Sequence, residues 1–208
     1  MEFKQFNYND IMGMDGMFRR YLMNTAEGYK NAGLIGTIDD NGNTNLALFN
    51  SIVHIGASPP LIGFIHRPLT VPKQTFTNIQ LNRSFTINLI TSRFYEKAHH
   101  TSARYAPGIS EFSASGLTPV FGKVKAPYVD ESPVRFGMSL EELIPIRSNN
   151  TYLVIGKVEE MFIREDLVEE DGNVLLHRAE IVAVSGLDNY YLPQPLGRLP
   201  YAKPKKDY

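Results

Sequence analysis

Short apolar runs separated by turn residues dominate the first third of the chain. Residues 33–49 hold two β-prone runs around Asp40-Asn41-Gly42, where asparagine and glycine tolerate the positive φ of a tight hairpin. Residues 52–65 continue with two strands that meet at Ser58-Pro59-Pro60, because proline removes a hydrogen-bond donor and interrupts pairing. The pattern predicts successive β-hairpins.

Two later segments also have strand patterns. Residues 84–90 alternate Phe85, Ile87 and Leu89 with polar residues, which predicts a half-buried strand. Residues 151–163 form a long apolar run rich in β-branched residues, which favours a further strand.

A helix signal competes with the strand pattern at residues 132–146. Ser139-Leu140-Glu141-Glu142 fits a capping box, but Pro145 leaves no room for a useful helix after it. We therefore expect a strand with an irregular end, followed further on by a turn at Asp171-Gly172.

Helices are expected in few places. The predicted helices span residues 12–24, 73–82 and 94–103, and Phe76 and Ile79 share a face at helical spacing in the second. Six to eight strands with few helices indicate a mainly β antiparallel barrel, which also removes the edges of such apolar strands.

Composition narrows the possible classes of protein. The 208 residues, 43% hydrophobic, are enough for one sizeable core, and we expect a single domain over residues 1–208. A net charge of −1 gives no global attraction to nucleic acid or anionic membranes. The absence of cysteine excludes disulfides and thiolate chemistry, in agreement with a reducing cytoplasm. No apolar run or signal-peptide core predicts membrane insertion or export.

The common catalytic and metal-binding motifs are missing from the sequence. It lacks GxGxxG after a strand, a Walker loop, GxSxG and HExxH, and no triad or acid pair stands out, so no catalytic residue is assigned. The only adjacent histidines, His99 and His100, would point in different directions from a helix and so make a poor metal-binding pair. The five histidines are scattered along the chain: His54, His66, His99, His100 and His177. We expect no metal site.

One segment has the composition of an anion site. Arg67 closes a strand, and Lys73, Gln74, Thr75 and Thr77 open a predicted helix. Helix starts carry free N–H donors, and hydroxyls with cations can complete a phosphate site. Alternatively, the hydroxyl and amide side chains only cap the helix while the cations are solvated, and composition leaves both interpretations open.

Phe49-Asn50-Ser51 places polar residues within an apolar strand. These residues line a ligand or occupy a bulge or strand edge. Taken alone, the motif favours the structural interpretation.

The ordered set of these segments resembles the flavin reductase-like family, which has an FMN-binding split barrel. The resemblance covers roughly residues 30 to 190, in order. Its segments are NLALFNS (45–51), SPPLIGFIHRP (58–68), PKQTFTNIQLNRSFTINL (72–89), SARYAPGISEFSASGLTPV (102–120) and EELIPIRSNNTYLVIGKVEEM (141–161).

The resemblance implies a six-stranded antiparallel Greek-key split barrel with a few flanking helices. It also implies a homodimer with FMN near the subunit interface, and hydride transfer from NAD(P)H to flavin N5, with a monooxygenase or electron-transfer protein as a further partner. Such a reaction needs few protein acids or bases, because the cofactor carries the chemistry.

The same resemblance assigns residues to the flavin. Phe49, Asn50 and Ser51 would meet the ring and ribityl chain, and the phosphate would be held by Arg67, Lys73, Gln74 and Thr75. A covering loop would contribute Ser102 and Ala103.

The sequence departs from the family pattern at two points. Gln74 replaces an acidic residue, and Leu48-Phe49 is bulkier than the usual small residues at the ring. Nothing resembles a dinucleotide fingerprint, so nicotinamide use rests on the family analogy.

Other functions remain open besides an NAD(P)H-dependent flavin reductase. A flavoredoxin-like electron carrier would bind flavin without its own nicotinamide site, and a structural barrel would bind no flavin. A pyridoxamine-phosphate-oxidase-like enzyme fits the order of the segments less well.

Overall fold

The computed structural model of the protein describes residues 1–68, 74–106 and 108–204. Its helices are α1 (Tyr8–Gly13), α2 (Gly16–Thr25), α3 (Gln74–Asn82), α4 (Tyr95–His100), α5 (Glu111–Ser115), and the 3₁₀ turns η1 (Glu165–Leu167) and η2 (Leu176–Ala179). Its strands are β1 (Lys30–Asn31), β2 (Gly33–Ile38), β3 (Thr44–Phe49), β4 (Ile52–Ala57), β5 (Pro60–His66), β6 (Ser84–Leu89), β7 (Pro119–Val120), β8 (Tyr128–Val129), β9 (Val134–Ile146), β10 (Thr151–Ile163), β11 (Ala183–Ser185) and β12 (Asn189–Tyr191).

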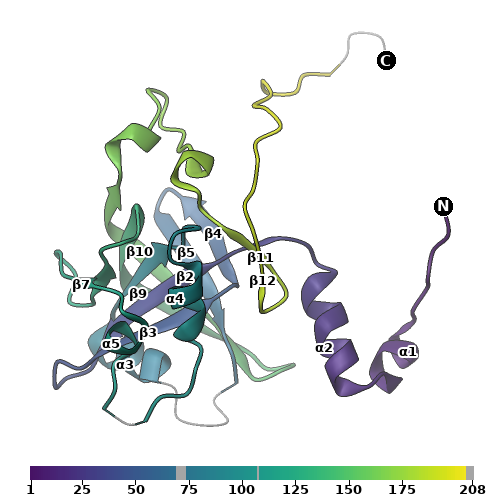
Figure 1. The fold of residues 1–208 in the computed structure, drawn as a ribbon, viewed down its shortest axis with the longest axis horizontal. Coiled ribbons are helices and arrows are strands. Elements are labelled where there is room, and N and C mark those ends of the chain that lie inside the picture. Colours follow the sequence, from purple (N-terminus) through teal and green to yellow (C-terminus); the bar gives the residue numbers. More distant parts are fainter. Residues whose placement is uncertain (69–73, 107, 205–208) are drawn as a thin grey trace.

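One antiparallel sheet forms the body of the molecule. Its described strands run in the order β3-β2-β6-β9-β10-β5-β4, so β3 and β4 are its two edges. Only Asn50 and Ser51 separate these edges in the chain, and the sheet therefore has to curl until they meet at that corner (Figure 1). The mainly β, antiparallel barrel is confirmed.

The sheet has seven strands where six were expected. The difference arises at the corner, because a single bent strand counts as two when the chain turns at Asn50 and Ser51. Counting β3 and β4 as one strand or as two does not alter the pairing of the remaining five strands.

Large apolar side chains fill the barrel. They come from five strands of the sheet, and Phe76 and Ile79 of α3 close one side, as the helical spacing predicted. A β-bulge brings Gly156 against this core, where an added Cβ would lie 2.5 Å from Phe85 Cζ. The strand residues of the core are Ile35, Phe64, Phe85, Ile87, Met138, Leu140 and Val154.

The predicted hairpins form as expected. Gly42, between β2 and β3, has φ of +86°, and the turn at Asp171-Gly172 has φ of +84° at the glycine. The capping-box residues lie inside β9, which confirms the strand. The expected irregular end was wrong, because the strand stays paired as far as Ile146. A bulge lies in the middle of β9 instead, where Glu142 and Leu140 oppose consecutive residues of β10.

The helices differ from the prediction in their limits. The helix expected over 12–24 is two helices, because Asp15 accepts hydrogen bonds from the Met17 and Phe18 amides and starts α2 anew. The helix expected over 94–103 ends at His100. The short α5 was missed, since five residues give too little periodicity to detect.

Strand β6 is buried on both faces, so the expectation of a half-buried strand was wrong. The segment around β8 covers its polar face and satisfies its polar groups. Thr86 Oγ1 donates to the Pro127 carbonyl at 2.6 Å, and Asn88 Oδ1 accepts from the Val129 amide at 3.0 Å. The alternation of apolar and polar residues in β6 therefore reflects an apolar face packed in the core and a polar face hydrogen-bonded to the β8 segment, with neither face open to solvent.

Helices α1 and α2 lie beside the barrel and bury none of their side chains (Figure 1). Across the described ranges, no helix has both the length and the apolar character needed to cross a membrane.

Candidate functional site

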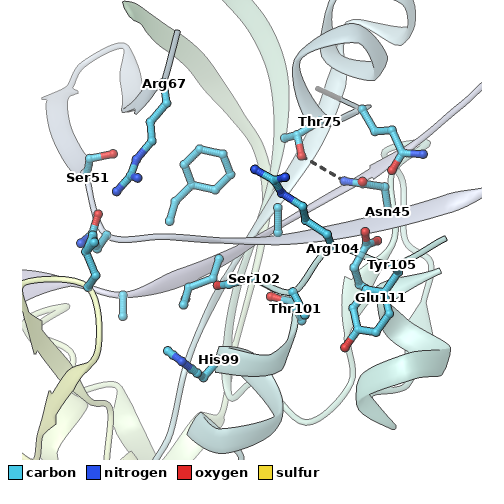
Figure 2. Close-up of a pocket in the computed structure, with 18 of the residues that line it drawn as sticks. Asn45, Ser51, Arg67, Thr75, His99, Thr101, Ser102, Arg104, Tyr105 and Glu111 are labelled. Carbon is cyan, nitrogen blue, oxygen red and sulfur yellow. Dashed lines mark hydrogen bonds between the residues drawn. The ribbon is translucent and has the colours of Figure 1, made fainter. Parts of the chain in front are cut away.

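A cavity of about 1020 Å³ lies where the β3–β4 corner faces the segment after α4 (Figure 2). This volume is at the upper end of the roughly 300–1,000 Å³ usual for small-molecule sites. Its walls come from β3, the ends of β5 and α4, the start of α3 and the β11–β12 turn. The lining includes every described residue that the sequence assigned to a cofactor: Phe49, Asn50, Ser51, Arg67, Gln74, Thr75, Ser102 and Ala103. Lys73 lies outside the described residues.

The corner residues line the cavity while their side chains hold the barrel together. The Phe49 ring packs edge-on against Phe64 with centroids 4.8 Å apart. Asn50 Nδ2 donates to the Gly186 carbonyl at 2.6 Å, and Ser51 Oγ both donates to the Ile65 carbonyl and accepts from its amide. The structural interpretation of this motif therefore holds for the side chains, and the corner backbone forms the cavity wall.

Buried polar groups mark the start of α3. Asn45 Nδ2 donates to Thr75 Oγ1 at 3.0 Å and also reaches Thr37 Oγ1 at 3.1 Å (Figure 2). Thr75 is 5% exposed, and because its oxygen accepts this bond, its hydroxyl hydrogen can donate to a ligand in the cavity. Gln74 is exposed beside it. The first N–H groups of a helix add donors at the same place.

Two arginines reach into the cavity from different walls. Arg67 follows β5 and Arg104 follows α4, and both side chains line the cavity, which they enter from separate walls (Figure 2). Both are exposed, and within the described part of the chain neither forms an ion pair or a side-chain hydrogen bond. Two cations that line one cavity and have no acidic partner favour a bound anion.

Sequence reasoning missed Arg104. The covering loop was assigned only Ser102 and Ala103, and Arg104 is the next residue in the chain. The available signal was a cation in SARYAP without an acidic neighbour, but only the fold brings it into the same cavity as Arg67.

The covering segment is held by α4. The Ser102 and Ala103 amides donate to the carbonyls of His99 and His100, each at 3.0 Å, and extend the helix as turns. Tyr105 Oη donates to the His100 carbonyl at 3.0 Å. These bonds fix the backbone of the segment while its exposed side chains face the cavity.

The side of the cavity away from Arg67 and Thr75 holds His99 (Figure 2). Its Nδ1 lies 3.0 Å from Tyr190 Oη of β12. Burial, and to a lesser degree the Asp188 carboxylate, raise the pKa of Tyr190 to about 12. The phenol is therefore protonated at neutral pH and can donate to His99.

The groups that line the cavity are suited to binding a ligand. In the described ranges, no group of three or more His, Asp or Glu side chains is arranged so that it could hold a metal ion. Glu111, a carboxylate in the lining, accepts from the Leu46 amide at 3.1 Å and so secures the edge of β3. The cavity offers an anion-binding side, a backbone wall and aromatic groups, which suit a flat ligand with an anionic tail.

Comparison with known proteins places these features in a family. The profile of the flavin reductase like domain matches residues 30–184. A split-barrel protein of Shewanella frigidimarina NCIMB 400, assigned as a flavin reductase, is 42% identical, with a TM-score of 0.92 over 96% of this chain and 100% of its own.

Two more distant structures share the fold. Nitrilotriacetate monooxygenase component B from Bacillus cereus is 21% identical, with a TM-score of 0.84 over 96% of this chain and 100% of its own. Flavoredoxin of Desulfovibrio vulgaris (Miyazaki F) is 22% identical, with a TM-score of 0.73 over 84% and 92% of the two chains.

Proposed function

This chain belongs to the family of flavin reductase like domains, and we propose that it binds FMN and acts as an NAD(P)H:flavin oxidoreductase. The family supports an oxidoreductase that uses a flavin. The specific cofactor, the nicotinamide donor and the residues of the site are the proposal.

The observation that carries the proposal is that Arg67, Arg104 and Thr75 all line one large cavity. A phosphate ester placed there would gain two charge-assisted contacts, a buried hydroxyl donor and the N–H groups at the start of α3. This set fits the singly substituted phosphate of FMN, and Lys73 and Gln74 are proposed to add to it.

The rest of the cavity suits the other parts of FMN. The backbone of Phe49, Asn50 and Ser51 would lie along the ring and ribityl chain, because their side chains are already used by the barrel. Ser102 and Ala103 would cover the opposite side. The bulky Phe49 does not obstruct this position, since its ring packs toward Phe64.

Bound FMN would supply the redox chemistry, accepting a hydride at N5 from the reduced nicotinamide together with a proton from solvent. The protein residues would then hold the phosphate and leave one ring face open to the donor. No side chain is assigned as an acid or base.

An absorption spectrum of the purified protein, followed by anaerobic addition of NADH and of NADPH, tests the function. We expect flavin bands, from bound or added FMN, that bleach within seconds to minutes of adding one nucleotide. A colourless protein that does not bind added FMN would contradict the proposal.

The alternative is a flavin-binding electron carrier, in keeping with the structural likeness to a flavoredoxin. Such a protein would keep its flavin bands when either nucleotide is added, and its NAD(P)H oxidation would stay at background. The same titration therefore separates the two functions.

We also propose a homodimer, with a monooxygenase or another electron acceptor as a further partner. Exposed apolar side chains on strand β4 and helix α2 support self-association, among them Val53, Ile55, Met17, Phe18 and Tyr21. Light scattering should give twice the 23.5 kDa of the chain, and a monomer mass would contradict the dimer. A reducing cytoplasm is the proposed compartment, because the sequence contains no cysteine.

A further inference from the structure

A second, smaller cavity adjoins the flavin cavity on the side of His99. Its volume is about 280 Å³, close to the lower limit for small-molecule sites. We call this cavity the annex; its lining is Tyr95, Glu96, His99, His100, Asp188 and Tyr190. Three of these residues also line the flavin cavity, so a ligand can extend from one into the other.

The annex has the opposite charge to the arginine side. Glu96 and Asp188 contribute two carboxylates, and the described residues of its lining include no lysine or arginine. One oxygen of Glu96 accepts from Tyr95 Oη at 3.1 Å, and one oxygen of Asp188 accepts from Asn189 Nδ2 at 3.1 Å. Both carboxylates can accept further hydrogen bonds from hydroxyl or amine donors, whereas they repel a phosphate.

The same residues provide aromatic surfaces. The rings of Tyr95 and Tyr190 lie 5.2 Å apart at an angle of 54°, and His99 packs edge-on against Tyr190 at 5.8 Å. Aromatic side chains of this kind stack with planar heterocycles. A ligand of the annex would therefore combine a planar ring with free hydroxyl groups and little negative charge.

We infer that the annex takes a nucleoside portion of the reduced nicotinamide dinucleotide with its ribose hydroxyls free, and that the enzyme therefore prefers NADH to NADPH. Carboxylates hydrogen-bond a ribose diol and repel a 2′-phosphate, as they do in unrelated dinucleotide sites. This inference rests on the proposed nicotinamide-dependent reduction of FMN.

Isothermal titration calorimetry of the full-length protein with NAD⁺ and NADP⁺ tests the annex without turnover. The wild type should bind NAD⁺ at least about tenfold more tightly than NADP⁺. In the double variant Glu96→Gln/Asp188→Asn this ratio should fall by about tenfold or more, because the repulsion of the 2′-phosphate is removed. The ratio of kcat/KM for NADH and NADPH should change in parallel.

Glu170→Gln is the matched control, because Glu170 is exposed and lies outside both cavities. Its NAD⁺ to NADP⁺ ratio should equal that of the wild type. Equal binding of the two nucleotides by the wild type, a preference for NADP⁺, or an unchanged ratio in the double variant would overturn the inference.

The two proposals can fail separately. Flavin bands that never bleach would contradict the reductase, whereas the nucleotide ratio from calorimetry still decides whether the annex discriminates. A reductase that bleaches equally well with both donors would contradict the annex alone.

Discussion

The arginine side of the flavin cavity and the adjoining annex differ in the sign of their charge, although one stretch of chain contributes to both. Within residues 95–106, Glu96 lies in α4 and lines the annex, whereas Arg104 follows the helix and lines the flavin cavity together with Arg67. His99 stands between the two sides. In this account, the arginine side holds the phosphate of one ligand, and the acidic side selects a second ligand that lacks one.

The largest effect is expected on the arginine side. Charge-assisted phosphate contacts contribute about 1.5–3 kcal/mol each, so Arg67→Ala combined with Arg104→Ala should weaken FMN binding by about a hundredfold or more. Quenching of flavin fluorescence during titration measures this affinity. Riboflavin, which has no phosphate, should bind the double variant and the wild type equally.

The exposed Arg178 in η2 provides the matched control, since it lies outside both cavities. Arg178→Ala should leave FMN affinity unchanged. If the double variant loses affinity for riboflavin as much as for FMN, the arginines do not hold the phosphate.

A smaller loss is expected at the start of α3. Thr75→Val removes the hydroxyl donor and leaves Asn45 Nδ2 without one of its acceptors, so FMN should bind about tenfold more weakly. Thr75→Ser keeps the hydroxyl and should restore most of the affinity. Equal losses in both variants would assign Thr75 a packing role instead.

Added salt should weaken the electrostatic interactions of both the arginine side and the annex with their ligands. Both effects are electrostatic at partly exposed groups, so raising ionic strength should weaken FMN binding and lower the preference for NAD⁺ over NADP⁺ by a few fold. Calorimetry at low and high sodium chloride measures both. Riboflavin affinity that falls as steeply as FMN affinity would argue against a phosphate site.

The smallest effect is expected on stability at high pH, through Tyr190, which lines both the flavin cavity and the annex. The unfolded phenol titrates near 10, and burial raises the pKa of Tyr190 to about 12 in the folded protein, so the folded state retains the proton longer. Stability should therefore fall as pH rises from about 10 to 12. Melting temperatures of Tyr190→Phe should show a shallower fall than the wild type, and identical slopes would contradict this assignment.

The sequence predicted the sheet well because its signals are local. The turn at Asp40-Asn41-Gly42 and the long run at residues 151–163 each specify an element without help from the rest of the chain. The burial of β6 could not be predicted, since it depends on a segment 41 residues further along the chain, where the Pro127 carbonyl accepts a hydrogen bond from Thr86.

The lining of the candidate site was predicted in part for the same reason. Strand ends and a helix start located Arg67 and Thr75 from nearby residues. Arg104 and the annex were missed, because α4 and the β11–β12 turn meet only in the folded chain. The polar character of Asn50 and Ser51 is evident from the sequence, but only the fold shows that their side chains form hydrogen bonds that hold the corner between β3 and β4.

A crystal structure of the protein with FMN tests the central claim most directly. We expect the phosphate between Arg67, Arg104 and the Thr75 hydroxyl, with the ring along the β3–β4 corner and one face open toward His99. A phosphate bound elsewhere, or a ring held outside this cavity, would contradict it.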